Sequence, residues 1–331
     1  SARVLMNCGV GNLERMAVIF RRAPLSTPLP LPVFSSSSNP LRPQVSFSAS
    51  AASARMEPHN QGRTKFMDFP YVSAPHRDLM LDLVSTLENR LGSQLLPCTL
   101  PPDVQYYQNQ TGTASATLHV RSGHKPSQID FILGSWIHCE LPTGGALNIT
   151  SLSAYLNSST DAPNFLIELI QGSPTSLVLI LDLPPRKELV LYPDYIQTFY
   201  EDTQLETRRQ VLEKIPEVVP YVSSSLYIRS LVSPTAIMAR IDTGTSGPGR
   251  MEEVVKSSIN PIAKELLDIW LDRCACGERE VAEVERAYLE KRDGLVKKKT
   301  IEIDLGMSLP RLFGQEVADR ILESLQEFFT A

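Results

Sequence analysis

The sequence predicts an α+β sandwich in which one antiparallel β-sheet is covered by helices on both faces. One helical segment comes first, five strand-like segments with short connections follow, and helical segments fill most of the remainder. Connections this short cannot hold crossover helices, so the strands should pair as an antiparallel meander. The strands are apolar on both sides, as expected when both faces of a sheet are covered.

The first helix is predicted at residues 74–92, because leucine recurs every four residues there and forms one apolar face. Gly92 is expected to end it. The next segment, LPCTLPPDV, contains three prolines that should exclude a helix. After the strands, helices are predicted at residues 195–212, 250–273, 280–298 and 314–329.

The five strands are predicted at residues 114–121, 129–141, 147–156, 165–171 and 177–183. In the fourth strand, Glu168 shares a face with Leu166 and Ile170, because side chains alternate along a strand. An ionised carboxylate on an apolar face is costly, so this residue is a candidate for acid–base or proton-coupled redox chemistry. The alternatives are a solvated glutamate or a buried one that accepts backbone N–H groups.

Residues 1–55 are predicted to be a disordered targeting segment, which leaves residues 56–331 as a single domain. The segment is rich in Ser, Pro and Ala and holds six arginines but one acidic residue, a composition typical of a chloroplast transit peptide. The whole chain has a formal charge of −5, so the remainder is acidic, which argues against a nucleic-acid partner. No apolar run is long enough for a transmembrane segment.

The sequence contains no glycine-rich dinucleotide motif after a strand, no P-loop, no H-E-x-x-H and no G-x-S-x-G. The five histidines include no close pair with metal-ligand spacing, and the five cysteines form no zinc or disulfide pattern. These features favour either a binding fold for an apolar ligand or an enzyme that takes electrons from elsewhere.

A second candidate acid lies in the segment TIEIDL, where Glu302 and Asp304 alternate with aliphatic residues. Either carboxylate is a candidate to point into a cavity beneath the last helices. The alternative is that both are surface acids that neutralise the lysines at residues 297–299.

Nine segments, in order from about Lys65 to the C-terminus, resemble the red chlorophyll catabolite reductase family, distant members of the ferredoxin-dependent bilin reductase fold. Residues 274–293 are the least alike. The segments are KFMDFPYVS, ENRLGSQLLPC, LPPDV, IDFILGSWIHCELPTG, LNITSLSAYLNSST, APNFLIELIQ, SLVLILDLP, VVPYVSSSLYIRS and LPRLFGQEV.

The resemblance implies an α/β/α sandwich that holds a linear tetrapyrrole between the sheet and the C-terminal helices. It implies a two-electron, two-proton reduction of the C20/C1 double bond of red chlorophyll catabolite, which gives a primary fluorescent catabolite. Reduced ferredoxin would supply the electrons, with no bound metal or flavin. A homodimer in the chloroplast stroma and contact with other chlorophyll-breakdown enzymes are also implied, and a mitochondrial fraction is left open.

Carried over residue by residue, the resemblance places the family's two pocket carboxylates at Glu168 and Asp304, as proton donors. It also places substrate contacts at three consecutive positions and at a fourth where some relatives have Phe, so the product epimer should be opposite to that of the Phe-bearing enzymes. These positions are Tyr221, Val222, Ser223 and Val232.

Two other functions are compatible with the residues: a non-catalytic tetrapyrrole or lipid carrier, and a cofactor-free hydrolase or isomerase that uses the two acids. A reductase would also need a basic patch to dock acidic ferredoxin. The candidate patches are residues 297–299, Arg186 with Lys187, and Arg208 with Arg209.

Overall fold

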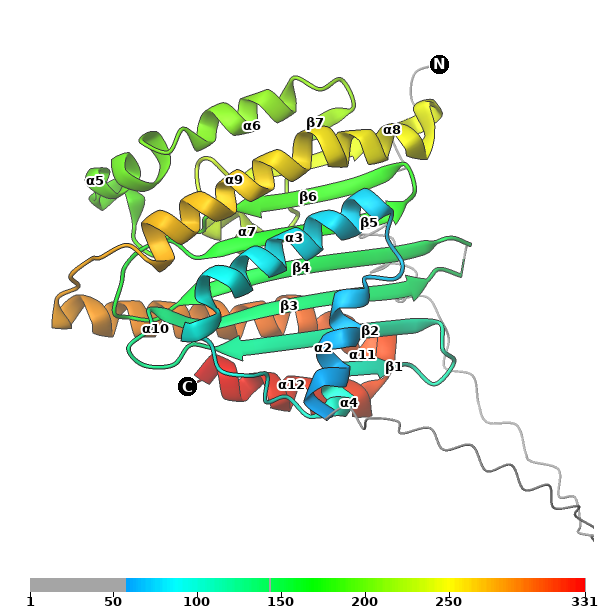
Figure 1. The fold of residues 1–331 in the computed structure, drawn as a ribbon, viewed down its shortest axis with the longest axis horizontal. Coiled ribbons are helices and arrows are strands. Elements are labelled where there is room, and N and C mark those ends of the chain that lie inside the picture. The colour runs from blue at the N-terminus through cyan, green and yellow to red at the C-terminus, as the bar shows by residue number, and fades with distance from the viewer. Residues whose placement is uncertain (1–57, 143, 331) are drawn as a thin grey trace, which may run out of the picture. The chain divides into compact units, whose positions relative to one another are not determined.

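The computed structural model describes residues 58–142 and 144–330; the predicted targeting segment at residues 1–55 lies outside them. The described chain is built on an eight-stranded sheet, with helices on both sides (Figure 1). Every neighbouring pair of strands is antiparallel, in the order β1-β2-β3-β4-β5-β6-β8-β7. The predicted fold class is therefore confirmed.

All five predicted strands are present, with ends within two residues of the predicted ones. They are β2 (Ala114–Ser122), β3 (Ile129–Glu140), β4 (Ala146–Leu156), β5 (Phe165–Ser173) and β6 (Ser176–Asp182). Three further strands were not predicted: β1 (Tyr106–Gln108), β7 (Val218–Pro220) and β8 (Ile237–Asp242). Two of these are three residues long, and β8 offers only a six-residue stretch of alternation.

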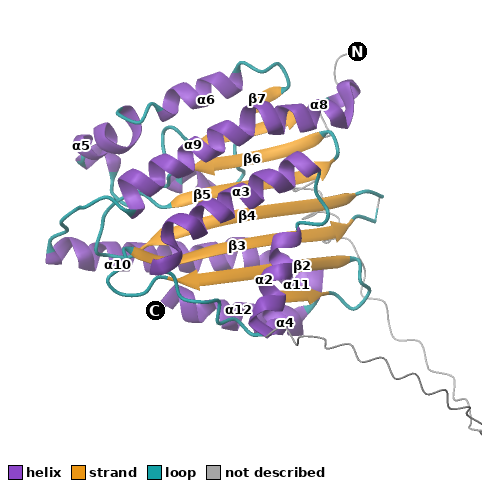
Figure 2. Cartoon of the chain, viewed as in Figure 1, coloured by secondary structure: helices purple, strands orange, loops and turns teal. Residues whose placement is uncertain are grey.

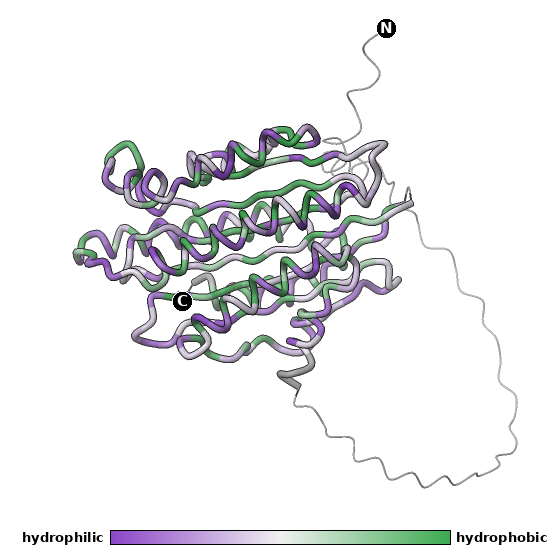
Figure 3. The backbone as a smooth tube through the Cα atoms, turned by 45° about the horizontal axis from the view of Figure 1, so that its top comes forward, coloured by the Kyte–Doolittle hydropathy of each residue, from purple (hydrophilic) through white to green (hydrophobic). Residues whose placement is uncertain are grey.

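One face of the sheet, called the closed face, is covered by α3 (Ala74–Leu91), α8 (Gly247–Val254) and α9 (Asn260–Trp270) (Figure 2). α2 (Pro58–Asp68) lies on the same face, where the ring of Phe66 fills the space above Gly134. These helices and the inward side chains of the strands form one continuous apolar core. Figure 3 shows hydrophobic strands beneath helices that alternate hydrophilic and hydrophobic residues.

The other face, called the open face, is covered over β1–β3 by the C-terminal helices, which lie behind the sheet in Figure 1. α10 (Glu283–Thr300), the π-helical turn η7 (Ile301–Leu305) and α11 (Gly306–Phe313) run without a break and are followed by α12 (Gln315–Thr330). Leu309, Leu312 and Phe313 pack with Leu118 and Val120 of β2 in a second, smaller core. The predicted helices at 280–298 and 314–329 are confirmed.

The remaining helical predictions hold with local corrections. The helix predicted at 250–273 is interrupted by a π-helical turn just before Pro261, which has no N–H to continue the α-helical pattern. The helix predicted at 195–212 is broken at Gln204, which has a φ of 56°. The segments are η5 (Val255–Ile259), η6 (Leu271–Ala275), α5 (Pro193–Ile196), η3 (Gln197–Glu201) and α6 (Leu205–Glu213).

The helix predicted at 74–92 is confirmed as α3, which ends at Leu91 with Gly92 as its C-cap, as predicted. Gly92 is not left-handed, because its φ is −56°, and it begins a 3-10 turn, η1 (Gly92–Gln94). One prediction about the following segment was wrong. The proline-rich segment does contain a one-turn helix, α4 (Pro102–Gln105), because proline is accepted in the first turn of a helix. The other short elements are η2 (Leu189–Leu191), α7 (Leu226–Leu231) and η4 (Gly244–Ser246).

Candidate functional site

The open face of β5 and β8 is less buried than the closed face of the same strands, whereas Ile180 and Asp182 on the open face of β6 are buried. In β5, Phe165, Ile167 and Leu169 are at most 1% exposed on the closed face, whereas Leu166 and Ile170 on the open face are half-buried. The C-terminal helices pack over β1–β3 and do not bury these side chains to the same extent. A partly open, mostly apolar surface that carries a few polar groups suits a flat apolar ligand.

Glu168 lies in the middle of this surface, on the half-buried side of β5, as predicted. Residues directly opposite each other on neighbouring strands point to the same face. The strand register therefore places Glu168 in a row with Ser135, Ser151, Ile180 and Met238. The hydroxyl oxygens of Ser135 and Ser151 are hydrogen-bonded at 2.8 Å, so one side of Glu168 is polar and the other is apolar.

Tyr221 extends the same row, because its N–H donates to the carbonyl oxygen of Met238 at 2.8 Å. Three strand spacings separate it from Glu168, which corresponds to about 14 Å. Ser223 follows, half-buried, and its hydroxyl accepts the N–H of Ser225, the N-cap residue of α7. Val222 is 66% exposed. The predicted contacts Tyr221 and Ser223 thus lie at the end of the Glu168 row, while the Val222 side chain is largely exposed.

Val232 is held next to this surface by a buried aspartate at the end of β6. Asp182 accepts the N–H of Ser233 at 2.9 Å and its hydroxyl at 2.5 Å. Because Asp182 pairs with Leu166 of β5, it lies on the open face, one row from Glu168. Val232 is the C-cap residue of α7 and immediately precedes Ser233. These two hydrogen bonds therefore fix the backbone position of Val232.

The environment of Asp182 also changes its acidity. Burial raises the pKa of this carboxyl to about 6, and the hydrogen bonds from Ser233 oppose that rise. The structure makes Asp182 the anchor of the segment that carries Val232.

Asp304 lies in η7, in the helical layer on the same side of the sheet as Glu168; its side chain lies outside the described part of the structure. The alternating pattern around it does not reflect an extended segment, because the chain is helical there. Ile301 and Leu305, four residues apart, pack on the smaller core. Glu302 is exposed and pairs with Lys299, so the surface interpretation holds for that acid.

The Arg186–Lys187 docking patch is wrong, because both residues serve the fold. Arg186 is fully buried and donates to Asp293 of α10 at 2.6 and 3.0 Å, and to the carbonyl oxygen of Thr160 at 2.8 Å. Lys187 pairs with Asp161. Removing one partner of a buried pair leaves an uncompensated charge, so the Arg186–Asp293 pair fixes α10 to the end of the sheet.

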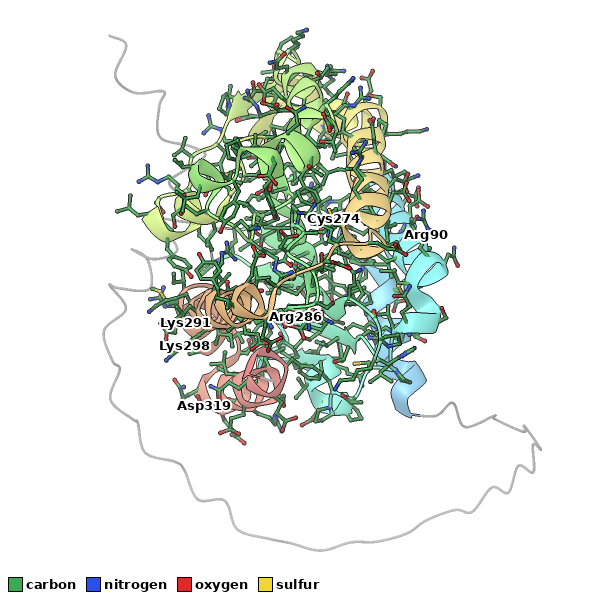
Figure 4. All side chains as sticks on the ribbon, turned by 90° about the vertical axis from the view of Figure 1, so that its left-hand side faces the viewer. Arg90, Cys274, Arg286, Lys291, Lys298 and Asp319 are labelled. Atoms are coloured by element: carbon green, nitrogen blue, oxygen red, sulfur yellow. The ribbon has the colours of Figure 1, made fainter. Side chains whose placement is uncertain are left out.

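In the other two candidate docking patches, residues 297–299 and Arg208 with Arg209, most basic side chains already form ion pairs. Arg208 and Arg209 form ion pairs with glutamates on their own or the neighbouring helix. Lys297 is buried against Asp130. Lys298 is exposed, and Figure 4 shows it with Lys291 on the side of α10 away from the sheet. These two lysines are basic groups on α10 that remain open to a partner.

Sequence reasoning missed Arg240, which lies on the open face of β8 two residues from Met238. The alternation in IMARID was the available signal, but β8 was not recognised. In residues 58–142 and 144–330, no cluster of three or more His, Cys, Asp or Glu has an arrangement that could hold a metal ion. None of the helices described is both long enough and apolar enough to cross a bilayer.

Comparison with known proteins gives a consistent result. Residues 75–327 match the family model "Red chlorophyll catabolite reductase (RCC reductase)". The chain is 52% identical over 318 residues to the chloroplastic red chlorophyll catabolite reductase of Arabidopsis thaliana, which covers 95% of this chain and 99% of the relative. It is 48% identical over 260 residues to the chloroplastic red chlorophyll catabolite reductase 1 of Oryza sativa, with 78% and 79% covered.

The fold is also similar to a solved structure, that of tomato phytochromobilin synthase in complex with biliverdin. The TM-score is 0.57 at 15% sequence identity, over 77% of this chain and 83% of the other. At this identity the likeness supports the fold.

Proposed function

This chain belongs to the red chlorophyll catabolite reductase family, and from that premise we propose that its open face binds and reduces a linear tetrapyrrole. The proposed reaction is the ferredoxin-dependent reduction of the C20/C1 double bond of red chlorophyll catabolite to a primary fluorescent catabolite. The observation that carries the proposal is the position of Glu168, a carboxylate at the centre of a half-open apolar sheet face.

In the proposed mechanism, two electrons arrive one at a time from reduced ferredoxin, an external donor, and two protons are added to the double bond. Glu168, on the sheet, and Asp304, in the helical layer opposite it, each donate one proton as the radical anion forms and is reduced further. Negative charge therefore does not accumulate on the apolar surface. Tyr221, Val222 and Ser223 would hold one edge of the substrate, through the backbone N–H groups of Val222 and Ser223 and the hydroxyl of Ser223, since the N–H of Tyr221 donates to Met238.

Ferredoxin docking is proposed to use exposed lysines on the outer side of α10. Of the predicted patches, Lys298 and Lys299 remain exposed, and Lys291 lies nearby on the same helix. The Lys299–Glu302 pair is on the surface, where such pairs contribute little, so it does not prevent docking.

The setting proposed for this activity is the chloroplast stroma. Two of the relatives are named chloroplastic, and the composition of residues 1–55 is that of a transit segment, ahead of a single reductase domain at residues 56–331. The enzyme is proposed to act as a homodimer, together with other enzymes of chlorophyll breakdown.

An anaerobic assay of red chlorophyll catabolite with reduced ferredoxin tests the function. Glu168→Gln and Asp304→Asn should each lower turnover by about 100-fold or more while substrate affinity changes only a few-fold, because each removes a proton donor and keeps the side-chain shape. The matched control is Glu140→Gln, an exposed glutamate at the end of β3, which should keep normal turnover. A carrier would bind the pigment and show no ferredoxin-dependent turnover in any form.

A further inference from the structure

Arg240 is a cation on the open face without a partner in the described part of the chain. Its Nε atom is buried and has no hydrogen-bond partner there. The side chain is half-buried, and it takes part in none of the ion pairs of the structure's described residues. Buried N–H groups nearly always have an acceptor, so the unmatched Nε–H of Arg240 is open to an acceptor from a ligand.

The immediate neighbours of Arg240 do not supply that acceptor in the structure. Val178 and Val219 lie directly opposite it on β6 and β7, and Met238 is the next residue of β8 on the same face. Asp242, two residues further along β8, is exposed and accepts the N–H of Gly244 instead. Arg240 therefore presents its charge from an apolar patch of the sheet, where a bound anion would be poorly screened by water.

Arg240 is also well separated from Glu168 on the same face. The register places it two strands across and two residues along from Glu168, which corresponds to about 12 Å between Cα atoms. A planar tetrapyrrole lying on the sheet can reach both residues, with its reacting ring system near Glu168 and a peripheral side chain near Arg240.

We propose that Arg240 binds a carboxylate side chain of the tetrapyrrole and so sets how the pigment lies relative to Glu168. This rests on the proposed function, because it assigns a subsite of the same surface. Arginine suits the role, since its planar fork can donate two parallel hydrogen bonds to one carboxylate. Arg186, the fully buried arginine, cannot serve because Asp293 occupies it.

The test compares a free-acid ligand with its ester in three variants. Biliverdin and its dimethyl ester are titrated by absorbance against the intact chain, Arg240→Gln, Arg240→Lys and the control Arg77→Gln. Arg77 is a half-buried arginine on α3, on the opposite side of the sheet. Arg240→Gln should weaken binding of the acid by about 10- to 100-fold and leave the ester unchanged. Arg240→Lys should give a smaller loss, and Arg77→Gln none.

The same comparison separates this inference from the proposed function. If Arg240→Gln weakens acid and ester equally, Arg240 supports the fold and the subsite is wrong. If the acid–ester difference is lost in Arg240→Gln but no form of the protein reduces red chlorophyll catabolite, the subsite stands and the proposed reaction fails. Equal affinity of the unaltered protein for acid and ester would overturn the proposal outright.

Discussion

The closed and open faces of the sheet are made by the same strands, yet they differ in what covers them. Ile167 points to the closed face and is fully buried beneath the helices, whereas Ile170, three residues away, points to the open face and is half-buried. The closed face collects most of the apolar core. The open face carries Glu168, Asp182 and Arg240. The closed face therefore contributes most of the stability of the sheet, and the lower burial of the open face fits the proposal that it binds the ligand.

The helices of the open face are attached mainly at one side of the sheet. α10 is held at the strand ends by Arg186–Asp293 and Lys297–Asp130, and α11 and α12 pack on β2. Because these contacts lie over β1–β3 and at the strand ends, β5, β6 and β8 can keep a partly uncovered surface without loosening the core.

The largest expected effect is a difference between two isoleucines of one strand. Ile167→Ala should lower the free energy of unfolding by about 3–5 kcal/mol, because it opens a cavity in the closed-face core, and should leave the KM of the folded protein unchanged. Ile170→Ala should cost about 1 kcal/mol or less and should raise KM instead. Urea unfolding and steady-state kinetics of the two variants provide the measurement. Equal losses of stability would contradict the distinction between the faces.

The pH dependence of stability should also have opposite signs on the two faces. His76, on the closed face, is hydrogen-bonded through its Nε2 to the hydroxyl oxygen of Thr150 at 2.8 Å, and burial lowers the pKa of His76 to about 4. Its neutral form therefore contributes stability that is present above about pH 6.5 and is lost as the pH falls towards 4. On the open face the pKa of Asp182 is raised to about 6, so its contribution is present below about pH 4 and is lost as the pH rises through 6.

Each contribution amounts to as much as ~3 kcal/mol, from a pKa change of two to three units. Unfolding free energies measured between pH 4 and 7 should fall less steeply on acidification in His76→Gln than in the unaltered protein. The unfolding free energy should fall more steeply on acidification in Asp182→Asn, because this variant lacks the carboxyl whose protonation stabilises the fold at low pH. If the plots of unfolding free energy against pH are parallel for all three proteins, burial does not shift the pKa of His76 or Asp182 as described.

The smallest expected effect concerns the stereoselectivity of the proposed reduction. Val232→Phe should shift the product towards the opposite C1 epimer, because a larger side chain beside Asp182 changes which face of the pigment is reached. A tenfold change in epimer ratio needs only about 1.4 kcal/mol. Chiral chromatography of the two products decides the question, and the same epimer in equal proportion from both proteins would end the hypothesis.

Local patterns were sufficient to predict the sheet, because β2–β6 each have strong alternation or a continuous apolar run bounded by turns. They failed at β8, where the alternation spans only six residues and pairing with β6 and β7 decides the structure. They also failed at TIEIDL, whose alternation fits a strand, although the chain continues as a helix from α10 into α11. Glu168 could be predicted because strand alternation fixes its face. The Asp182–Ser233 bond joins residues 51 positions apart, so no local pattern reports it.

The two borders of the sheet have a consequence for solubility. β1 and β7 each span three residues, and β7 finishes at Pro220, which has no N–H to offer. Unpaired backbone N–H and C=O groups on an edge strand can pair with a strand of another chain, which promotes aggregation. The short edge strands therefore offer few unpaired backbone groups to a second chain, although part of the open face is apolar.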